Sequence, residues 1–324
     1  MPASRRAISA AFRSIALGSI ALLASSAAIA DDTDPRELLR RMSVALRTVD
    51  FEGSFIYQHE GRTDALRIFH QGGERERERL VSLNGGRGEI VRSGATITCV
   101  QPGAAPTLFA NRADMRLLPL APDLRQVGAQ YSVVLAGEDR VAGYDARILD
   151  IEPRDPWRYG YRLWLQRDNQ LLLRSAVVDA ARRPLAQFMF VALEIGSRPS
   201  ETDLLPAHDI ADAATPGDEV RIATRPSWIV AGAPAGFRLI RAQRPAGGDA
   251  KAEHLVYSDG LANVSVYIEP HAGSAQSAVE STVVRGALSI HSRDADGLRV
   301  TALGDVPSAT VQAMARSVRA SAGG

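Results

Sequence analysis

Charged side chains alternate strictly in the hexapeptide 74–79, ERERER. If this stretch is extended, three glutamates lie on one face, and Arg75, Arg77 and Arg79 form a basic row on the other, suited to phosphate or carboxylate groups. If it is helical, the charges pair locally. A third interpretation is a solvated hairpin arm whose charges discourage pairing between sheet edges. The small stabilisation that surface ion pairs provide favours this third interpretation.

Other residues able to perform chemistry are scattered. The motifs of zinc proteases, serine hydrolases, dithiol enzymes and P-loop nucleotidases are absent. The one cysteine, Cys99, excludes an intrachain disulfide, and its apolar neighbours favour a small buried hydrophobe over a reactive thiol. The six histidines are dispersed, so each is expected to be a surface or strand residue rather than a metal ligand: His59, His70, His208, His254, His271 and His291. We therefore expect no enzyme, no metal site and no cofactor.

A glycine-rich segment, 84–88 (NGGRG), joins two predicted strands. A loop that cradles phosphate should lead into a helix, so this segment is interpreted as a turn. The formal net charge of the chain is +1, and it becomes −2 when the three arginines of the acid-free first thirty residues are left out. A net charge this close to zero does not indicate a protein that binds nucleic acid.

Residues 1–30 have the features of a secretory signal. Arg5, Arg6 and Arg13 precede the apolar run 15–23, and an A-x-A site at 28–30 predicts cleavage before Asp31. The apolar run is shorter than the ~20 residues that a membrane-spanning helix needs, which disfavours an uncleaved anchor. Export from a bacterial cytoplasm without a further signal predicts a periplasmic location.

Periodicity in the rest of the chain predicts an α+β protein with two domains. An amphipathic helix begins at Asp34, which can cap it, with Pro35 in the first turn and Glu37 completing a capping box. Many short alternating runs with turn signals between them then predict a large, strongly curved antiparallel sheet or partial barrel in the domain 31–196. Residues 197–218 are rich in Pro, Ala, Asp and Ser and are expected to form a linker. A smaller α+β domain is predicted for 219–324, with a hairpin turn at Asp259-Gly260.

A curved sheet covered by one helix leaves a concave face lined by alternating apolar side chains. Such a hollow can hold an apolar ligand, at about 0.8 kcal/mol per buried methylene group. The pattern alone favours the alternative, in which the chain's own side chains fill the hollow completely. The candidates for lining it are Phe51, Phe55, Tyr57, Leu66, Ile68, Tyr159, Tyr161, Leu163 and Leu165.

Three ordered blocks of the sequence resemble the MucB/RseB family of periplasmic sigma-E regulatory proteins, and the likeness extends over essentially the whole mature chain. The first block is the helix and strand of 38–57 with FEGSF at 51–55. The second is VAGYDA at 141–146 with IEPRDPWRYGYRLWL at 151–165. The third is YSDGL at 257–261 with VSVY at 264–267 and VTALGDVP at 300–307.

The resemblance implies an N-terminal half-open barrel covered by helices, similar to the periplasmic lipoprotein carriers, and a smaller C-terminal domain. It implies a negative regulator of the sigma-E envelope stress response, which binds the periplasmic part of a membrane-bound anti-sigma factor and protects it from proteolysis. Lipopolysaccharide or mislocalised lipoprotein is the expected relieving ligand, with its acyl chains in the hollow. A periplasmic lipoprotein or lipid carrier is the alternative, although a pure carrier should not need the second domain. The sequence leaves open whether the chain forms a homo-oligomer.

Overall fold

The computed structural model describes residues 34–85, 88–94, 96–100, 107–109, 127–207, 221–222, 225–244, 252–271 and 280–321. The signal sequence predicted for residues 1–30 lies outside this part of the chain. Among the described residues, no helix combines the length and apolar character needed to cross a bilayer. Residues Thr33–Gly324 group into one compact unit.

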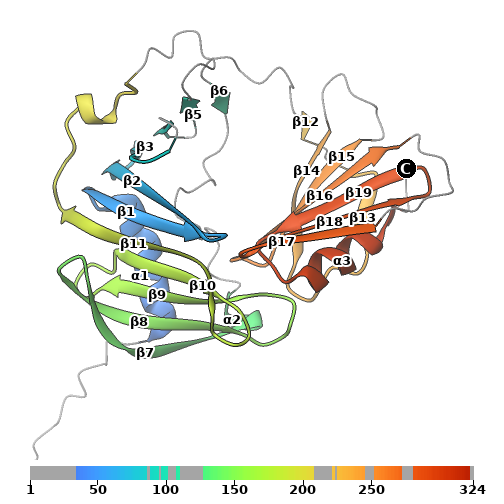
Figure 1. Cartoon of the computed structure of the whole chain (residues 1–324), viewed down its shortest axis with the longest axis horizontal. Coiled ribbons are helices and arrows are strands. Elements are labelled where there is room, and N and C mark those ends of the chain that lie inside the picture. Colours follow the sequence, from blue (N-terminus) through green and yellow to red (C-terminus); the bar gives the residue numbers. More distant parts are fainter. Residues whose placement is uncertain are drawn as a thin grey trace, which may run out of the picture. The chain divides into compact units, whose positions relative to one another are not determined.

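Eleven antiparallel strands form the first sheet, which curves around a helix (Figure 1). Their spatial order is β6-β5-β4-β3-β2-β1-β11-β10-β9-β8-β7. The predicted large antiparallel sheet is thus confirmed. In chain order the strands are β1 (Phe51–His59), β2 (Arg62–Gln71), β3 (Arg77–Ser82), β4 (Glu89–Ser93), β5 (Thr96–Val100), β6 (Thr107–Phe109), β7 (Tyr131–Val141), β8 (Tyr144–Pro153), β9 (Gly160–Gln166), β10 (Leu172–Val178) and β11 (Pro184–Ile195).

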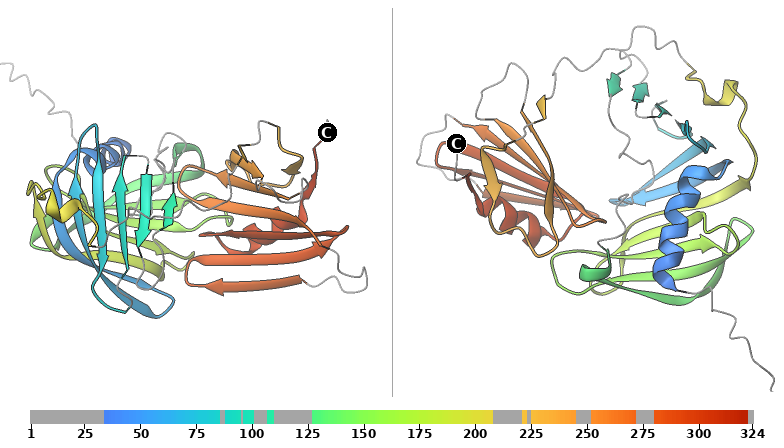
Figure 2. Two further views of the ribbon diagram at one scale, coloured as in Figure 1. Left: turned by 90° about the horizontal axis from the view of Figure 1, so that it is seen from above. Right: turned by 180° about the vertical axis from the view of Figure 1, so that it is seen from behind.

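The helix that this sheet surrounds is α1 (Pro35–Thr48), and a short helix, α2 (Val127–Gln130), precedes β7. Asp34 caps α1 as predicted, because its carboxylate accepts a hydrogen bond from the backbone N–H of Arg36 at 3.0 Å. The carboxylate of Glu37, expected to complete a capping box, instead binds the guanidinium groups of Arg40 and Arg41. Figure 2 shows α1 lying across the strands of the sheet.

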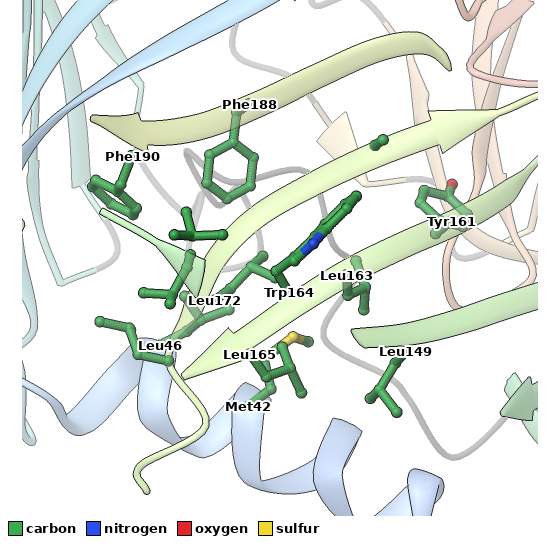
Figure 3. Close-up of a cluster of buried hydrophobic side chains, with 14 of the residues drawn as sticks. Met42, Leu46, Leu149, Tyr161, Leu163, Trp164, Leu165, Leu172, Phe188 and Phe190 are labelled. Carbon is green, nitrogen blue, oxygen red and sulfur yellow. The ribbon is translucent and has the colours of Figure 1, made fainter. Parts of the chain in front are cut away.

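The core of this part lies between α1 and one face of the sheet. Met42 and Leu46 of α1 meet Leu165 and Leu172 of the sheet, with Phe188 and Phe190 on the neighbouring strand β11 (Figure 3). The aromatic rings of β1 and β11 pack edge to face, with ring centroids 5.6 Å apart for Phe55 and Phe190. The two backbones approach closely at Gly53, where a Cβ atom would lie 2.6 Å from the carbonyl oxygen of Ala192.

Replacing Gly53 with alanine is therefore expected to lower the free energy of unfolding by about 1–3 kcal/mol, because the added methyl group overpacks the contact between β1 and β11. Gly88 is the matched control, since a Cβ atom there meets only the carbonyl oxygen of Val100, at 3.8 Å. Urea denaturation of both variants measures the difference. Equal stability of Gly53→Ala and Gly88→Ala would contradict the packing argument.

Seven antiparallel strands form the second sheet, in the order β12-β14-β15-β16-β19-β18-β17. Helix α3 (Ser308–Arg316) covers one face of it, and Val311 and Met314 of this helix are fully buried against Leu255 and Val264. The smaller α+β architecture is as predicted. The strands are β12 (Arg221–Ile222), β14 (Arg238–Arg244), β15 (Glu253–Ser258), β16 (Asn263–Pro270), β17 (Glu280–Arg285), β18 (Leu288–Ala295) and β19 (Leu298–Gly304), with β13 (Trp228–Val230) pairing separately with β20 (Val318–Ala320).

The segment predicted as a linker, 197–218, begins with residues that pack against the first sheet. A single 3₁₀ turn, η2 (Thr202–Leu204), buries Leu204. The backbone N–H of Ala207 donates to Oε1 of Glu89 at 2.8 Å, and Glu201 pairs with Arg77 of β3. Residues 208–218 lie outside the described part of the chain.

Candidate functional site

The nine residues predicted to line a hollow all belong to one cluster. They come from β1, β2 and β9 and the residue before β9, and the register places them on the face of the first sheet that α1 covers. Six of them are buried in the core: Phe51, Phe55, Ile68, Tyr161, Leu163 and Leu165. These six pack together with buried residues of α1, so this part of the concave face is filled by the protein's own side chains.

The other three residues, Tyr57, Leu66 and Tyr159, are half-buried and pack against the edge of the same cluster. Burial, followed by the negative charges of nearby carboxylates, raises the pKa of Tyr57, and burial is also the main cause that raises the pKa of Tyr159. Both phenols therefore stay neutral and offer a hydroxyl group beside apolar surface. This edge is the less buried part of the predicted hollow.

The predicted basic row is divided between a turn and a strand. Arg75 is exposed in the turn before β3, whereas Arg77 and Arg79 lie on one face of β3. Glu201 pairs with Arg77, and Oε2 of Glu89 lies 2.8 Å from Nε of Arg79. Arg77 and Arg79 therefore have acidic partners from their own chain. Because β3 lies between β2 and β4, the hexapeptide is not an exposed sheet edge either.

A buried charged cluster lies on the opposite face of β3 and includes a histidine that the sequence did not single out. Nδ1 of His70 lies 2.8 Å from the carbonyl oxygen of Val49, and Nε2 lies 3.3 Å from Oε1 of Glu76 and 3.8 Å from Oε1 of Glu78. These three side chains have the donor atoms of a metal site within 4.8 Å of one another. Arg92, however, lies 2.5 Å from both carboxylates, so a cation of the chain itself already binds them.

The thiol of Cys99 is half-buried on β5, and burial raises its pKa. A raised pKa lowers the thiolate fraction at neutral pH, and the thiolate is the reactive form. This position agrees with the interpretation of Cys99 as a small apolar residue, although its burial is incomplete.

The main polar feature missed in the sequence is a buried ion pair that joins the two sheets, which we call the joint and define as Tyr131, Arg158 and Asp259. Nη1 of Arg158, from the loop between β8 and β9, lies 2.6 Å from Oδ2 of Asp259, from the turn between β15 and β16, and both side chains are 0% exposed. The hydroxyl group of Tyr131 donates to the same oxygen at 2.9 Å. Nη2 of Arg158 donates to the carbonyl oxygen of Ala235 at 2.6 Å, so the guanidinium is well satisfied.

Asp259 also fixes the hairpin turn that the sequence predicted. Its Oδ1 accepts hydrogen bonds from the backbone N–H groups of Leu261 and Ala262, at 3.0 and 2.8 Å. The sequence thus identified the turn but not the partner of its aspartate, because Arg158 and Asp259 are 101 residues apart. Both residues fall inside the blocks of sequence on which the family resemblance rests.

Comparison with known proteins identifies the family. Residues 34–208 match the MucB/RseB N-terminal domain, and residues 223–319 match the MucB/RseB C-terminal domain. The sigma factor AlgU regulatory protein MucB of Pseudomonas aeruginosa is 35% identical over 301 residues, which cover 88% of this chain and 91% of that protein. The sigma-E factor regulatory protein RseB of Haemophilus influenzae is 28% identical over 305 residues, 93% of this chain and 96% of that protein.

Solved structures agree with this assignment. A crystal structure of MucB in complex with MucA(peri) matches with a TM-score of 0.71 and 31% identity, over 89% of this chain and 100% of the other. A crystal structure of MucB matches with a TM-score of 0.62 and 32% identity, over 89% and 98%. With both halves matched and this level of identity, the chain belongs to the MucB/RseB family of sigma-E regulatory proteins.

Proposed function

We propose that this chain is a periplasmic negative regulator of a sigma-E-type envelope stress response. It binds the periplasmic part of a membrane-bound anti-sigma factor and protects that segment from proteolysis. The observation that carries the proposal is the match, over both sheets, to a MucB crystal structure that contains MucA(peri). The relatives named as sigma factor regulatory proteins support it further.

We infer the domain division predicted from the sequence, with a first domain at 31–196 and a second at 219–324. The separate family matches at 34–208 and 223–319 support it, and two buried residues of the second domain, Leu261 and Ala287, pack in the hydrophobic cluster of the first. A second domain that is joined to the first by a buried ion pair is more than a lipid carrier needs. The regulator is therefore favoured over the carrier.

Lipopolysaccharide or mislocalised lipoprotein relieves the protection in this proposal. An acyl chain enters beside Tyr57, Leu66 and Tyr159, where the concave face is only half-buried. A ligand that binds better to one arrangement of the two domains shifts the protein toward that arrangement. If the anti-sigma factor binds the other arrangement better, each ligand weakens the binding of the other by the same factor.

The test is a titration of the purified chain with the periplasmic segment of the anti-sigma factor from the same organism, by isothermal calorimetry. We expect a dissociation constant of about 1 μM or tighter, or about −8 kcal/mol, and protection of the bound segment from the protease that starts its degradation. A segment of scrambled sequence is the control, since it keeps the charge and composition. Native mass spectrometry of the same sample gives the stoichiometry of the complex and any homo-oligomer.

A second titration includes lipopolysaccharide. We expect the affinity for the segment to fall by about tenfold, which corresponds to a coupling of about 1.4 kcal/mol. No binding of the native segment would exclude the regulatory function. If lipopolysaccharide leaves the affinity for the segment unchanged, the proposed relief is excluded, but the assignment of the anti-sigma segment as the partner is not.

A further inference from the structure

A separate cavity lies on the face of β8, β9 and β10 that points away from α1. The register places Asp150 opposite Arg162, and Arg162 opposite Ala176. Leu149 and Leu163, one residue away on the same strands, belong to the core cluster that contains α1, so the alternation of side chains directs Asp150 and Arg162 to the other face. Ala176 is buried in that cluster too, but its register opposite Arg162 places it on the face of Arg162. Asp150, Arg162 and Ala176 line a cavity of about 480 Å³. This volume is in the range of small-molecule sites, about 300–1,000 Å³.

The carboxylates in this cavity are largely neutralised by arginines of the same chain. Arg162 binds both oxygens of Asp150 at 2.7 Å, and Nη1 of Arg182 lies 2.9 Å from Oδ2 of Asp150. Arg182 also binds Glu152. Burial alone would raise the pKa of Asp150, but the hydrogen bonds and charges of the two arginines outweigh burial and lower it. Asp150 is therefore ionised at neutral pH, and Arg162 and Arg182 are engaged.

Arg174, which also lines the cavity, has no such partner. Its guanidinium lies 4.1 Å from the ring centroid of Trp164, and Nη2 donates to the neutral amide oxygen of Gln187 at 3.1 Å. Its buried Nε has no acceptor, and within the described part of the chain no carboxylate lies within 4.0 Å of this guanidinium. The ring of Trp164 is held in place because its Nε1–H donates to Oδ2 of Asp139 at 2.9 Å.

One wall of the cavity thus carries a guanidinium that has no ion pair within 4.0 Å in the described part of the chain, although, after the hydrogen bonds that Asp139 accepts, its charge also lowers the pKa of Asp139. Beside it lies apolar lining from Pro153, Ala176, Val178 and Pro184. A guanidinium in partly desolvated surroundings binds carboxylate or phosphate oxygens strongly, and apolar lining favours an apolar body. We propose that this cavity is a binding site for a small amphiphile that has one anionic oxygen group, recognised by Arg174, and a short apolar body. The proposal does not depend on the family assignment, and the site lies on the opposite face of the sheet from the predicted acyl hollow.

Octanoate and octanol are the probes, because they share an eight-carbon body and differ in charge. Isothermal calorimetry at neutral pH, below the micellar concentration, measures both affinities. We expect octanoate to bind at least about tenfold more tightly than octanol, a difference of about 1.4 kcal/mol. Equal affinities in the unmodified protein would overturn the proposal.

Two variants assign the site. Arg174→Gln is expected to remove the preference for octanoate, whereas Arg40→Gln, which changes a 65% exposed arginine of α1 paired with Glu37, should keep it. Ala176→Leu places a larger side chain in the cavity and is expected to weaken both probes while Arg174 stays intact. Thermal unfolding checks that each variant is folded. If Arg174→Gln does not fold, Ala176→Leu still tests whether the probes bind in this cavity. A preference that persists in Arg174→Gln, or unchanged binding in Ala176→Leu, would refute the assignment.

The anionic group could belong to a soluble metabolite or to a lipid, and vesicles distinguish these sources. Retention of the protein on phosphatidylglycerol vesicles but not on phosphatidylcholine vesicles, lost in Arg174→Gln, supports a lipid headgroup. Binding of octanoate without retention on either kind of vesicle supports a soluble anion.

Discussion

Arg158→Met is expected to lower the free energy of unfolding by about 3–5 kcal/mol, because it leaves the carboxylate of Asp259 buried without its countercharge. Both side chains are 0% exposed, and their closest atoms are 2.6 Å apart, so water does not replace the lost partner. The variant also loses the hydrogen bond to the carbonyl oxygen of Ala235. Urea denaturation followed by far-ultraviolet circular dichroism at neutral pH measures the loss.

Two comparisons separate the destabilisation caused by the unpaired carboxylate of Asp259 from the destabilisation caused by removing an arginine side chain. Arg183→Met removes an exposed arginine from its pair with Asp179 and is expected to cost less than about 1 kcal/mol. The double variant Arg158→Met with Asp259→Asn removes both charges and keeps Oδ1 as the acceptor in the turn, so it should be more stable than Arg158→Met alone. A double variant as unstable as Arg158→Met would show that the buried carboxylate is not the cause.

The joint holds the two sheets together by a direct contact in addition to the chain that links them. A flexible linker alone would let two domains hold a peptide through their effective concentration. A buried ion pair adds a contact that must be kept or broken as a whole, because one charge left unpaired inside the protein is costly. A relieving ligand that acted by separating the two parts would therefore have to offset the cost of breaking this ion pair.

Much of the fold could be predicted from the sequence because local patterns determine it. Asp34 and Pro35 mark the start of α1. The apolar side chains along one face of this helix must be buried against a larger surface, and the first sheet provides that surface. Alternating runs and turn signals predicted antiparallel strands, and the turn at Asp259 joins β15 to β16 as expected. The order of the strands in the sheet was not predictable, because β1 pairs with β11, more than a hundred residues later.

The candidate site was predictable only in part. Alternation placed Phe55 and Leu163 on the face that α1 covers, but alternation cannot tell a filled core from a hollow, and most of these side chains fill the core. Arg77 and Arg79 of the predicted basic row pair with Glu201 and Glu89, which come from other segments of the chain. Long-range partners of this kind leave no periodic signal, which is also why the joint was missed.

Arg92→Met is the second substitution with a large expected effect, and we expect it to lower the free energy of unfolding by about 3–5 kcal/mol at neutral pH. The side chain of Arg92 is 2% exposed and lies 2.5 Å from carboxylates of both Glu76 and Glu78. Without it, two acidic groups remain in a largely buried site beside the ring of His70. Urea denaturation measures the change, and Arg92→Lys, which keeps one positive charge but not the fork of donors, should lose less.

The same variant tests whether Arg92 excludes a metal ion. A carbonyl oxygen can only accept, so the contact with Val49 places a proton on Nδ1 of His70 and directs Nε2 toward Glu76 and Glu78. In the unmodified protein the guanidinium occupies the carboxylates, and added Zn²⁺ is expected to leave the thermal midpoint unchanged. In Arg92→Met the guanidinium no longer binds Glu76 and Glu78, and Zn²⁺ should raise the midpoint, since a ligand that binds only the folded state stabilises it. Stabilisation of the unmodified protein by Zn²⁺ would contradict this account, because it would mean that the arginine and the metal ion do not compete.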